Sequence, residues 1–266
     1  MKTPNITGKE LFKWLVANKA ELIDAKKAAT KHADATSFNP LSLSTEVTKG
    51  KYLYEDDEDG GSLKRTIIAN TYNYLDSHGD VHLEGIFSNS IEQRKNRPAP
   101  HLYDHNFSVL SKVGKALNYT ERKISWRELG LGKTGTTTAL VLESEVKRGM
   151  NEKVFDAYLN GEIDQHSVAM RYINVSLAVN DEEEYPNEYK VWQEVIGKVG
   201  NRAEAEKKGY FWAIREAALL ETSAVLEGSN VLTPTLGKTQ PSEDIEPKNV
   251  QPPFVLNRVA ILNNFL

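Results

Sequence analysis

Cysteine is absent from this sequence of 266 residues. Its absence excludes a thiolate nucleophile, a thiolate metal site and a disulfide framework. A chain without disulfides is typical of a reducing compartment. The chemistry of this protein must therefore be sought among its other polar side chains.

Long apolar runs are also missing, and none approaches the length needed to cross a bilayer. The first ten residues, MKTPNITGKE, lack the apolar core of a signal peptide. A formal net charge of −4 provides no general basic field that would hold nucleic acid. We therefore expect a cytoplasmic protein that binds neither a membrane nor nucleic acid.

The composition indicates one principal domain with extensions at both ends. Hydrophobic residues make up 39% of the chain and charged residues 26%, which is enough to bury a sizeable core. Residues 1–61 are expected to form a helical extension and an acidic linker that ends in EDDEDGG, and residues 62–236 the domain itself. Helical spacing over residues 180–209 predicts an insertion, and the proline-rich polar residues 237–266 a flexible tail.

Local patterns predict several elements within these parts. Thr7 and Glu10 are spaced as a capping box for an amphipathic N-terminal helix. Two alternating stretches between residues 63 and 87, separated by residues 76–79, predict a hairpin. A further strand is expected over residues 136–146 and a helix over residues 152–160.

Three short segments offer the residue types of a nucleophilic hydrolase: a base at His105, a hydroxyl at Ser167 and an acid at Glu221. A serine hydroxyl needs an imidazole to take its proton, and the imidazole needs a third group to orient it. His166 is adjacent to Ser167, but neighbours on a strand point to opposite faces. The base is therefore expected to come from His105, at the end of an apolar segment.

The order of segments around these residues resembles the serine proteases that mature the proheads of tailed bacteriophages, which are relatives of the herpesvirus assemblins. Ser167 takes the nucleophile position of that pattern, and Glu221 and Ser223 take the two marked positions of its E-x-S segment. The four matching segments, in order, are RTIIANTYNYLDSHGDVHLEGIFSNSIEQ (65–93), LYDHNFSVLSKVGKAL (102–117), FDAYLNGEIDQHSVAMRYI (155–173) and REAALLETSAVLEGSN (215–230).

The resemblance implies a fold, an activity and partners. The fold would be α+β, a mostly antiparallel β-barrel flanked by helices as in herpesvirus proteases. The activity would be that of a serine endopeptidase without a cofactor or metal, which cleaves the scaffold protein, the major capsid protein and itself during virion assembly. The protein would act in the host cytoplasm inside the viral prohead, and the assemblins imply a homodimer.

The third member of the triad stays open at this point. Glu221 could hold the imidazole tautomer and stabilise its charged form. Asp104 competes by its proximity to His105, although strand geometry would turn the two side chains apart. His82 also competes, because the herpesvirus relatives use a second histidine. Ser223 lies on the same strand face as Glu221, where it would be either a hydrogen-bonding partner or a purely structural residue.

Two other functions compete with the protease hypothesis. The chain could be a catalytically inactive scaffold or capsid-assembly protein that keeps the fold. It could also be another serine hydrolase such as an esterase, but Ser167 is not in a G-x-S-x-G elbow. The glycine-rich segment GLGKTGTT lacks the first glycine of a phosphate-binding loop, because Arg127 stands there, and it is expected to be a loop between strands.

Overall fold

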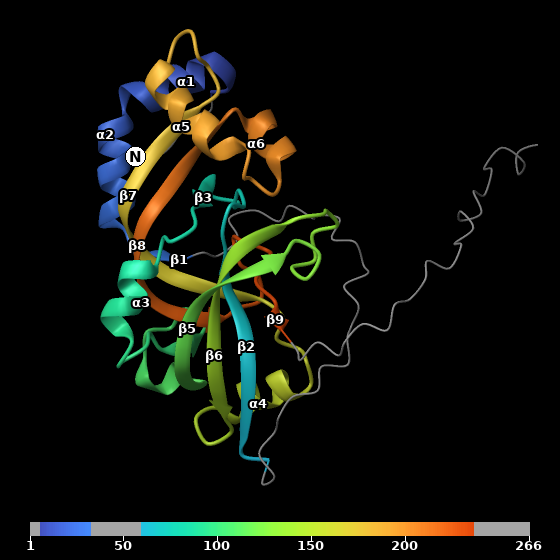
Figure 1. Ribbon diagram of the computed structural model, residues 1–266. Coiled ribbons are helices and arrows are strands. Elements are labelled where there is room, and N and C mark those ends of the chain that lie inside the picture. Colours follow the sequence, from blue (N-terminus) through green and yellow to red (C-terminus); the bar gives the residue numbers. More distant parts are fainter. Residues whose placement is uncertain (1–5, 33–59, 237–266) are drawn as a thin grey trace, which may run out of the picture.

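The computed structural model describes residues 6–32 and 60–236 (Figure 1). The predicted linker within residues 33–59 and the predicted tail at residues 237–266 lie outside these ranges. The helices are α1 (Gly8–Ala17), α2 (Lys19–Ala28), α3 (Ser88–Arg94), α4 (Glu152–Leu159), α5 (Pro186–Ile196) and α6 (Arg202–Lys208). The strands are β1 (Lys31–His32), β2 (Ser62–Thr71), β3 (Asp80–His82), β4 (His101–Tyr103), β5 (Gly114–Ser125), β6 (Thr136–Lys147), β7 (His166–Val179), β8 (Tyr210–Ala224) and β9 (Thr235–Leu236).

All these strands belong to one mixed sheet. Eight of them follow the order β1-β7-β8-β4-β5-β6-β2-β9, and β3 pairs with β8 outside that path. Among the described residues the two ends of the path, β1 and β9, do not pair, so the predicted closed barrel is wrong and the sheet is open. The pairings of β3 and β4 with β8 are parallel, and the other strand pairs are antiparallel.

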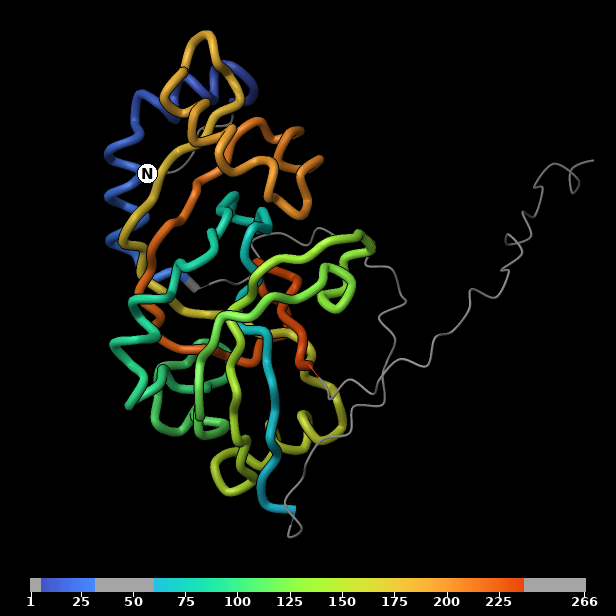
Figure 2. Tube along the Cα trace, in the orientation of Figure 1, coloured from blue at the N-terminus to red at the C-terminus, as the bar shows by residue number. Residues whose placement is uncertain are grey.

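The longest strands form the frame of the sheet. β7 and β8 pair along their whole length, from His166 opposite Ala224 to Val179 opposite Tyr210 (Figure 2). The predicted strand over residues 136–146 is confirmed as β6, whose inner residues Ala139–Leu142 are fully buried. A side chain at Gly114 of β5 would lie 2.6 Å from the backbone oxygen of Glu145, so β5 and β6 can approach there only with glycine.

The predicted hairpin within residues 63–87 is wrong. β2 pairs with β6 and β9, while β3 pairs in parallel with β8. The chain does reverse at residues 76–79, where Leu75 bridges Val81 in antiparallel fashion and the amides of Asn73 and Asp76 donate to His82 O and Asp80 O, but β2 and β3 do not pair with each other in the described ranges. Alternation of apolar and polar residues indicates which side chains of a strand are buried, and does not indicate which strand it pairs with. Here both segments pair with longer strands that are distant in sequence.

Apolar spacing predicted the N-terminal helices, α4 and the helical region 180–209, but not α3. The N-terminal helix is broken at Asn18 into α1 and α2, and the side chain of Thr7 makes no capping hydrogen bond. The predicted helix over residues 152–160 is confirmed as α4, with Phe155 and Tyr158 buried. The region 180–209 contains α5 and α6. No helix in the described ranges is long and apolar enough to cross a membrane.

Buried ion pairs attach the N-terminal helices to the sheet. Lys26 of α2 donates to Asp80 over 2.6 Å, and Lys31 of β1 pairs with both Asp80 and Asp76. Burial alone would raise the pKa of Asp80, but the ammonium groups of Lys31 and Lys26 outweigh it and hold that pKa well below its usual range. Removal of either lysine would leave buried carboxylate charge uncompensated, so residues 6–32 are an integral part of the fold.

Candidate active site

Three neighbouring strands carry the three predicted residues. Ser167 is the second residue of β7, Glu221 lies near the end of β8, and His105 follows the end of β4. Because β8 lies between β7 and β4 in the sheet, Glu221 stands between the strand of Ser167 and the strand that precedes His105. Residues separated by up to 116 positions in sequence are thus brought to one point.

The side chains form a continuous chain of hydrogen bonds. The Nε2 atom of His105 lies 2.8 Å from Oγ of Ser167, and its Nδ1 atom lies 2.5 Å from Oε1 of Glu221. A carboxylate can only accept, so Nδ1 carries the proton and Nε2 is left to accept from the serine hydroxyl. This is the tautomer that a general base requires.

A tight turn directs the side chain of His105 toward β7. Asp104 and His105 both adopt left-handed backbone conformations, with φ of 50° and 49°. Such angles disfavour residues other than glycine by roughly 1–2 kcal/mol each, so the surrounding structure must hold them. The amide of Asp104 donates to Ala224 O over 3.0 Å, and the amide of His105 donates to Oγ of Ser223 over 3.1 Å.

Glu221 is fully buried and receives donors on both oxygens. Oε1 accepts from the amide of Ala169 over 3.0 Å as well as from His105, and Oε2 accepts from the hydroxyl of Ser223 over 2.5 Å. Three donors on one carboxyl group fix its position. Ser223 therefore connects two members of the site, because it accepts from the backbone of His105 and donates to Glu221.

The structure places the two alternative third members elsewhere. Asp104 is exposed on the turn that precedes His105. His82 is buried in another polar cluster, where Nδ1 lies 2.9 Å from Asn70 and Nε2 lies 3.1 Å from the hydroxyl of Tyr172. Burial lowers the pKa of His82 to about 4, so it is neutral at pH 7. Glu221 is the residue that contacts the base.

His166 points away from Ser167, as strand alternation predicts. Its Nδ1 atom lies 3.0 Å from the backbone oxygen of Thr233, and its Nε2 atom lies 2.8 Å from the hydroxyl of Tyr158. The same hydroxyl lies 3.0 Å from Nε2 of His101, whose Nδ1 lies 2.9 Å from Oγ of Ser144. We call these four side chains, Ser144, Tyr158, His101 and His166, the neutral row. Burial lowers the pKa of His101 to about 3 and that of His166 to about 4.

Two contributors to this site were not foreseen from the sequence. The backbone amide of Ala169 gives no signal in a sequence, because every residue other than proline has one. His101 was not recognised as a member of a buried histidine pair, although the spacing H-x-x-x-H from His101 to His105 was present in the same segment. Only the turn after β4 separates the environments of these two histidines.

The N-terminal segment borders the site. β1 pairs with β7 in antiparallel fashion, with Lys31 opposite Met170 and His32 opposite Ala169. These positions lie two and three residues beyond Ser167 on the strand that carries the nucleophile. An extended peptide added to this edge of β7 would therefore meet β1 at Ala169.

Comparisons with protein-family models, with curated proteins and with solved structures found no match.

Proposed function

We propose that this protein is a serine endopeptidase with Ser167 as nucleophile, His105 as general base and acid, and Glu221 as the group that orients His105. The observation that carries the proposal is the continuous path of 2.8 Å and 2.5 Å from Ser167 through His105 to a buried carboxylate. Such an arrangement can supply nucleophilic catalysis on unrelated folds, because geometry and role define it.

The chemistry follows from the tautomer. Oγ of Ser167 attacks the carbonyl carbon of the scissile bond while its proton passes to Nε2 of His105. Glu221 stabilises the resulting imidazolium through Nδ1. His105 then gives the proton to the leaving amine, and the C–N bond breaks to leave an acyl-enzyme. Water, deprotonated by His105, releases the acid product and restores the serine.

The substrates we propose are the scaffold protein and the major capsid protein of a tailed phage, and the chain itself, cleaved inside the prohead in the host cytoplasm. This part rests on the resemblance of the four segments to prohead proteases. An esterase is disfavoured because Ser167 lies inside strand β7, whereas the esterase elbow places its serine on a sharp turn between a strand and a helix.

The test is incubation of the purified protein with its scaffold and capsid proteins, followed by intact mass measurement of the fragments. We expect wild type to cleave and Ser167→Ala not to. Ser176→Ala, on the same strand but partly exposed, is the matched control and should cleave like wild type. Cleavage by neither wild type nor control would favour the alternative, a catalytically inactive assembly protein that keeps this fold.

A further inference from the structure

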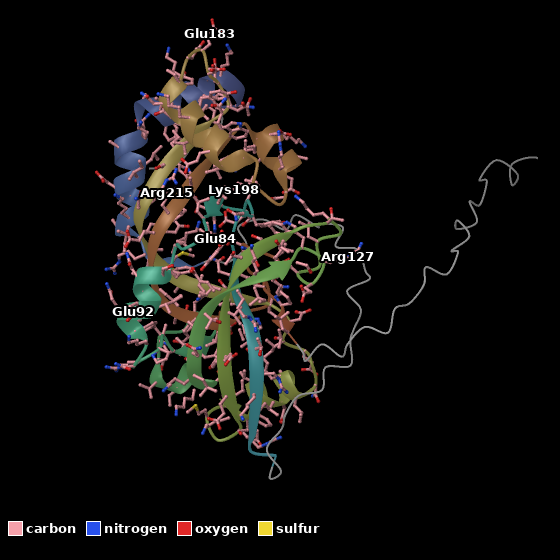
Figure 3. All side chains as sticks on the ribbon, in the orientation of Figure 1. Glu84, Glu92, Arg127, Glu183, Lys198 and Arg215 are labelled. Atoms are coloured by element: carbon pink, nitrogen blue, oxygen red, sulfur yellow. The ribbon has the colours of Figure 1, made fainter. Side chains whose placement is uncertain are left out.

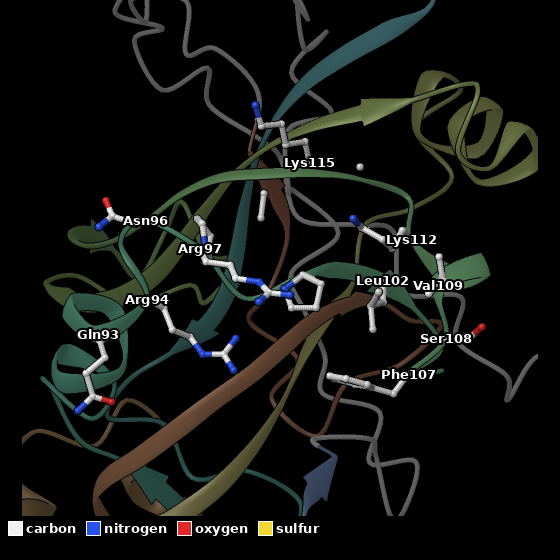
Figure 4. Close-up of a pocket in the computed structure, with 14 residues that line it drawn as sticks. Gln93, Arg94, Asn96, Arg97, Leu102, Phe107, Ser108, Val109, Lys112 and Lys115 are labelled. Atoms are coloured by element: carbon white, nitrogen blue, oxygen red, sulfur yellow. The ribbon is translucent and has the colours of Figure 1, made fainter.

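A groove with cationic walls opens beside the turn that carries His105 (Figure 4). Its volume is about 980 Å³, and it is lined by the end of α3, strand β4, residues 107–109 and the start of β5. Arg94, Arg97, Lys112 and Lys115 line it, and among residues 6–32 and 60–236 no aspartate or glutamate does. Like charges gathered in a concave surface concentrate a positive field, which favours an anionic occupant.

These cations have no counter-ions in the described part of the chain. None of the four forms an ion pair with a carboxylate of residues 6–32 or 60–236. Apolar side chains lie among them: Phe107 is 72% exposed and Val109 is 85% exposed at the rim. A matching ligand would therefore combine several carboxylates with apolar or aromatic groups.

The chain itself contains a segment of this chemistry. Residues 52–59 read YLYEDDED, two tyrosines and a leucine followed by five consecutive acids. The segment lies outside the described residues and ends immediately before Gly60, the first residue described after it. Its five negative charges complement the four positive charges of the groove.

The point where this segment joins the sheet is close to the groove. Leu63 of β2 and Gly114 of β5 pair with Val146 from its two sides, so they lie two strand spacings apart, roughly 10 Å. Gly114 is itself a lining residue. Leu63 lies four positions after Asp59, a stretch of chain that can span roughly 14 Å. The acids can therefore reach the groove without any change in the fold.

We propose that residues 52–59 dock in this groove of their own chain, with the acids on the four cations and the aromatic residues against Phe107 and Val109. Docking does not depend on hydrolysis and stands or falls separately from the proposed function. It would place the segment next to the turn of His105, where it would compete with any other acidic peptide for the groove.

Zero-length cross-linking tests the docking. A carbodiimide joins an amine to a carboxylate only when the two are in contact, so we expect Ser167→Ala protein to give cross-links from Lys112 or Lys115 to residues 55–59. Mixing unlabelled and ¹⁵N-labelled protein separates links within a chain from links between chains. Absence of these cross-links would overturn the proposal. Cross-links that form only between chains would also overturn it, and would show that the groove binds a second copy of the protein.

A competition measurement provides the second test. The probe is a fluorescein-labelled octaglutamate peptide, followed by fluorescence anisotropy on Ser167→Ala protein. Neutralising residues 55–59 to asparagine and glutamine should raise its affinity roughly tenfold, because an internal competitor has been removed. Neutralising Glu182 and Glu183, which are exposed at the far end of the molecule near α5, should leave it unchanged (Figure 3).

Substitution of the groove arginines tests whether the probe binds in the groove. Arg94→Glu with Arg97→Glu, added to the neutralised variant, should abolish binding of the probe. Thermal unfolding shows whether each variant folds. If the variant with both arginines replaced does not fold, the affinity of the variant neutralised at residues 55–59 is the test of docking. An affinity that does not change on neutralising residues 55–59 would contradict docking in the same chain.

Discussion

Two histidine environments lie on opposite faces of the sheet near Ser167. His105 contacts a carboxylate and a serine hydroxyl, with its side chain 5% exposed. His101 and His166 are fully buried and contact only hydroxyls and a backbone oxygen. The carboxylate partner allows His105 to take up a proton, whereas neutral partners and burial prevent it in the neutral row.

The hydrogen bonds of the neutral row are compatible with two neutral imidazole rings. His166 donates from Nδ1 to Thr233 O, so its Nε2 accepts from the hydroxyl of Tyr158. The oxygen of Tyr158 in turn accepts from Nε2 of His101, and Nδ1 of His101 accepts from Ser144. A proton added to Nε2 of His166 would set two donors against each other at the hydroxyl of Tyr158. At His101, burial without a counter-charge disfavours the proton.

The largest effect is expected from the nucleophile. Ser167→Ala should lower kcat by a factor on the order of 10⁶, because the remaining site can only bind and polarise. The measurement is cleavage rate on whichever scaffold or capsid protein wild type cuts. Ser144→Ala removes a serine from the neutral row and should change kcat/KM by less than about threefold. Equal losses in both variants would mean that the two environments do not differ in the way we describe.

The orienting acid should come next. Glu221→Gln keeps the size of the side chain but presents an amide to His105, which can then hold the wrong tautomer, and kcat should fall on the order of 10³–10⁴-fold. Glu216→Gln, on the same strand, should retain activity, since its carboxylate contacts only Asn89 on the surface. Full activity in Glu221→Gln would remove the carboxylate from the mechanism.

A smaller effect is expected at Ser223, which we regard as a positioning residue. Ser223→Ala deprives the amide of His105 of its acceptor and Glu221 of one donor, so kcat/KM should fall roughly 10–100-fold. The pH profile distinguishes positioning from mere stability, because a changed hydrogen bond to Glu221 should move the acidic limb of the profile. Ser223→Thr keeps the hydroxyl and should restore most of the activity. A loss that follows thermal stability alone, with an unmoved pH profile, would contradict this role.

The smallest effect is expected in the pH dependence of the free energy of unfolding. Burial lowers the pKa of His101 to about 3 and that of His166 to about 4, below the usual value near 6.5, so the unfolded chain binds more protons between pH 6.5 and 4. The free energy of unfolding should therefore fall as pH drops through that window, by at most about 1.4 kcal/mol per pH unit for each histidine. Urea unfolding at several pH values measures it.

Imidazole ¹⁵N NMR sharpens the same prediction, because it reports the protonation of each ring separately. At pH 5 the rings of His101 and His166 should still be neutral. A charged ring at either position in the folded protein at pH 5 would show that the neutral row does not exclude a proton.

The site was more predictable from the sequence than the fold. His105, Ser167 and Glu221 were identifiable because each occupies a short segment with a characteristic arrangement of neighbours, and strand alternation alone placed His166 on the opposite face. The geometry of the turn at Asp104 could not be foreseen, since neither residue is a glycine and the left-handed conformations depend on acceptors in β8.

The fold was harder because strand partners are distant in sequence. Alternation around residues 63–87 predicted strands correctly at β2 and β3 but paired them with each other, whereas their partners are 68 to 85 positions away in β6 and 132 away in β8. Periodicity reports which face of a strand is buried and contains no information about its neighbour. The barrel came from the family resemblance instead, and it is not closed, because β1 and β9 at the ends of the strand order do not pair in the described part of the chain.

Labelling with a serine-directed fluorophosphonate, mapped by peptide mass, tests the central claim most directly. The wild-type protein should carry one adduct on Ser167, and His105→Ala should lose it while His101→Ala keeps it if that variant folds. An adduct on another serine, or equal labelling of Ser167 with and without His105, would contradict the activation of Ser167 by His105.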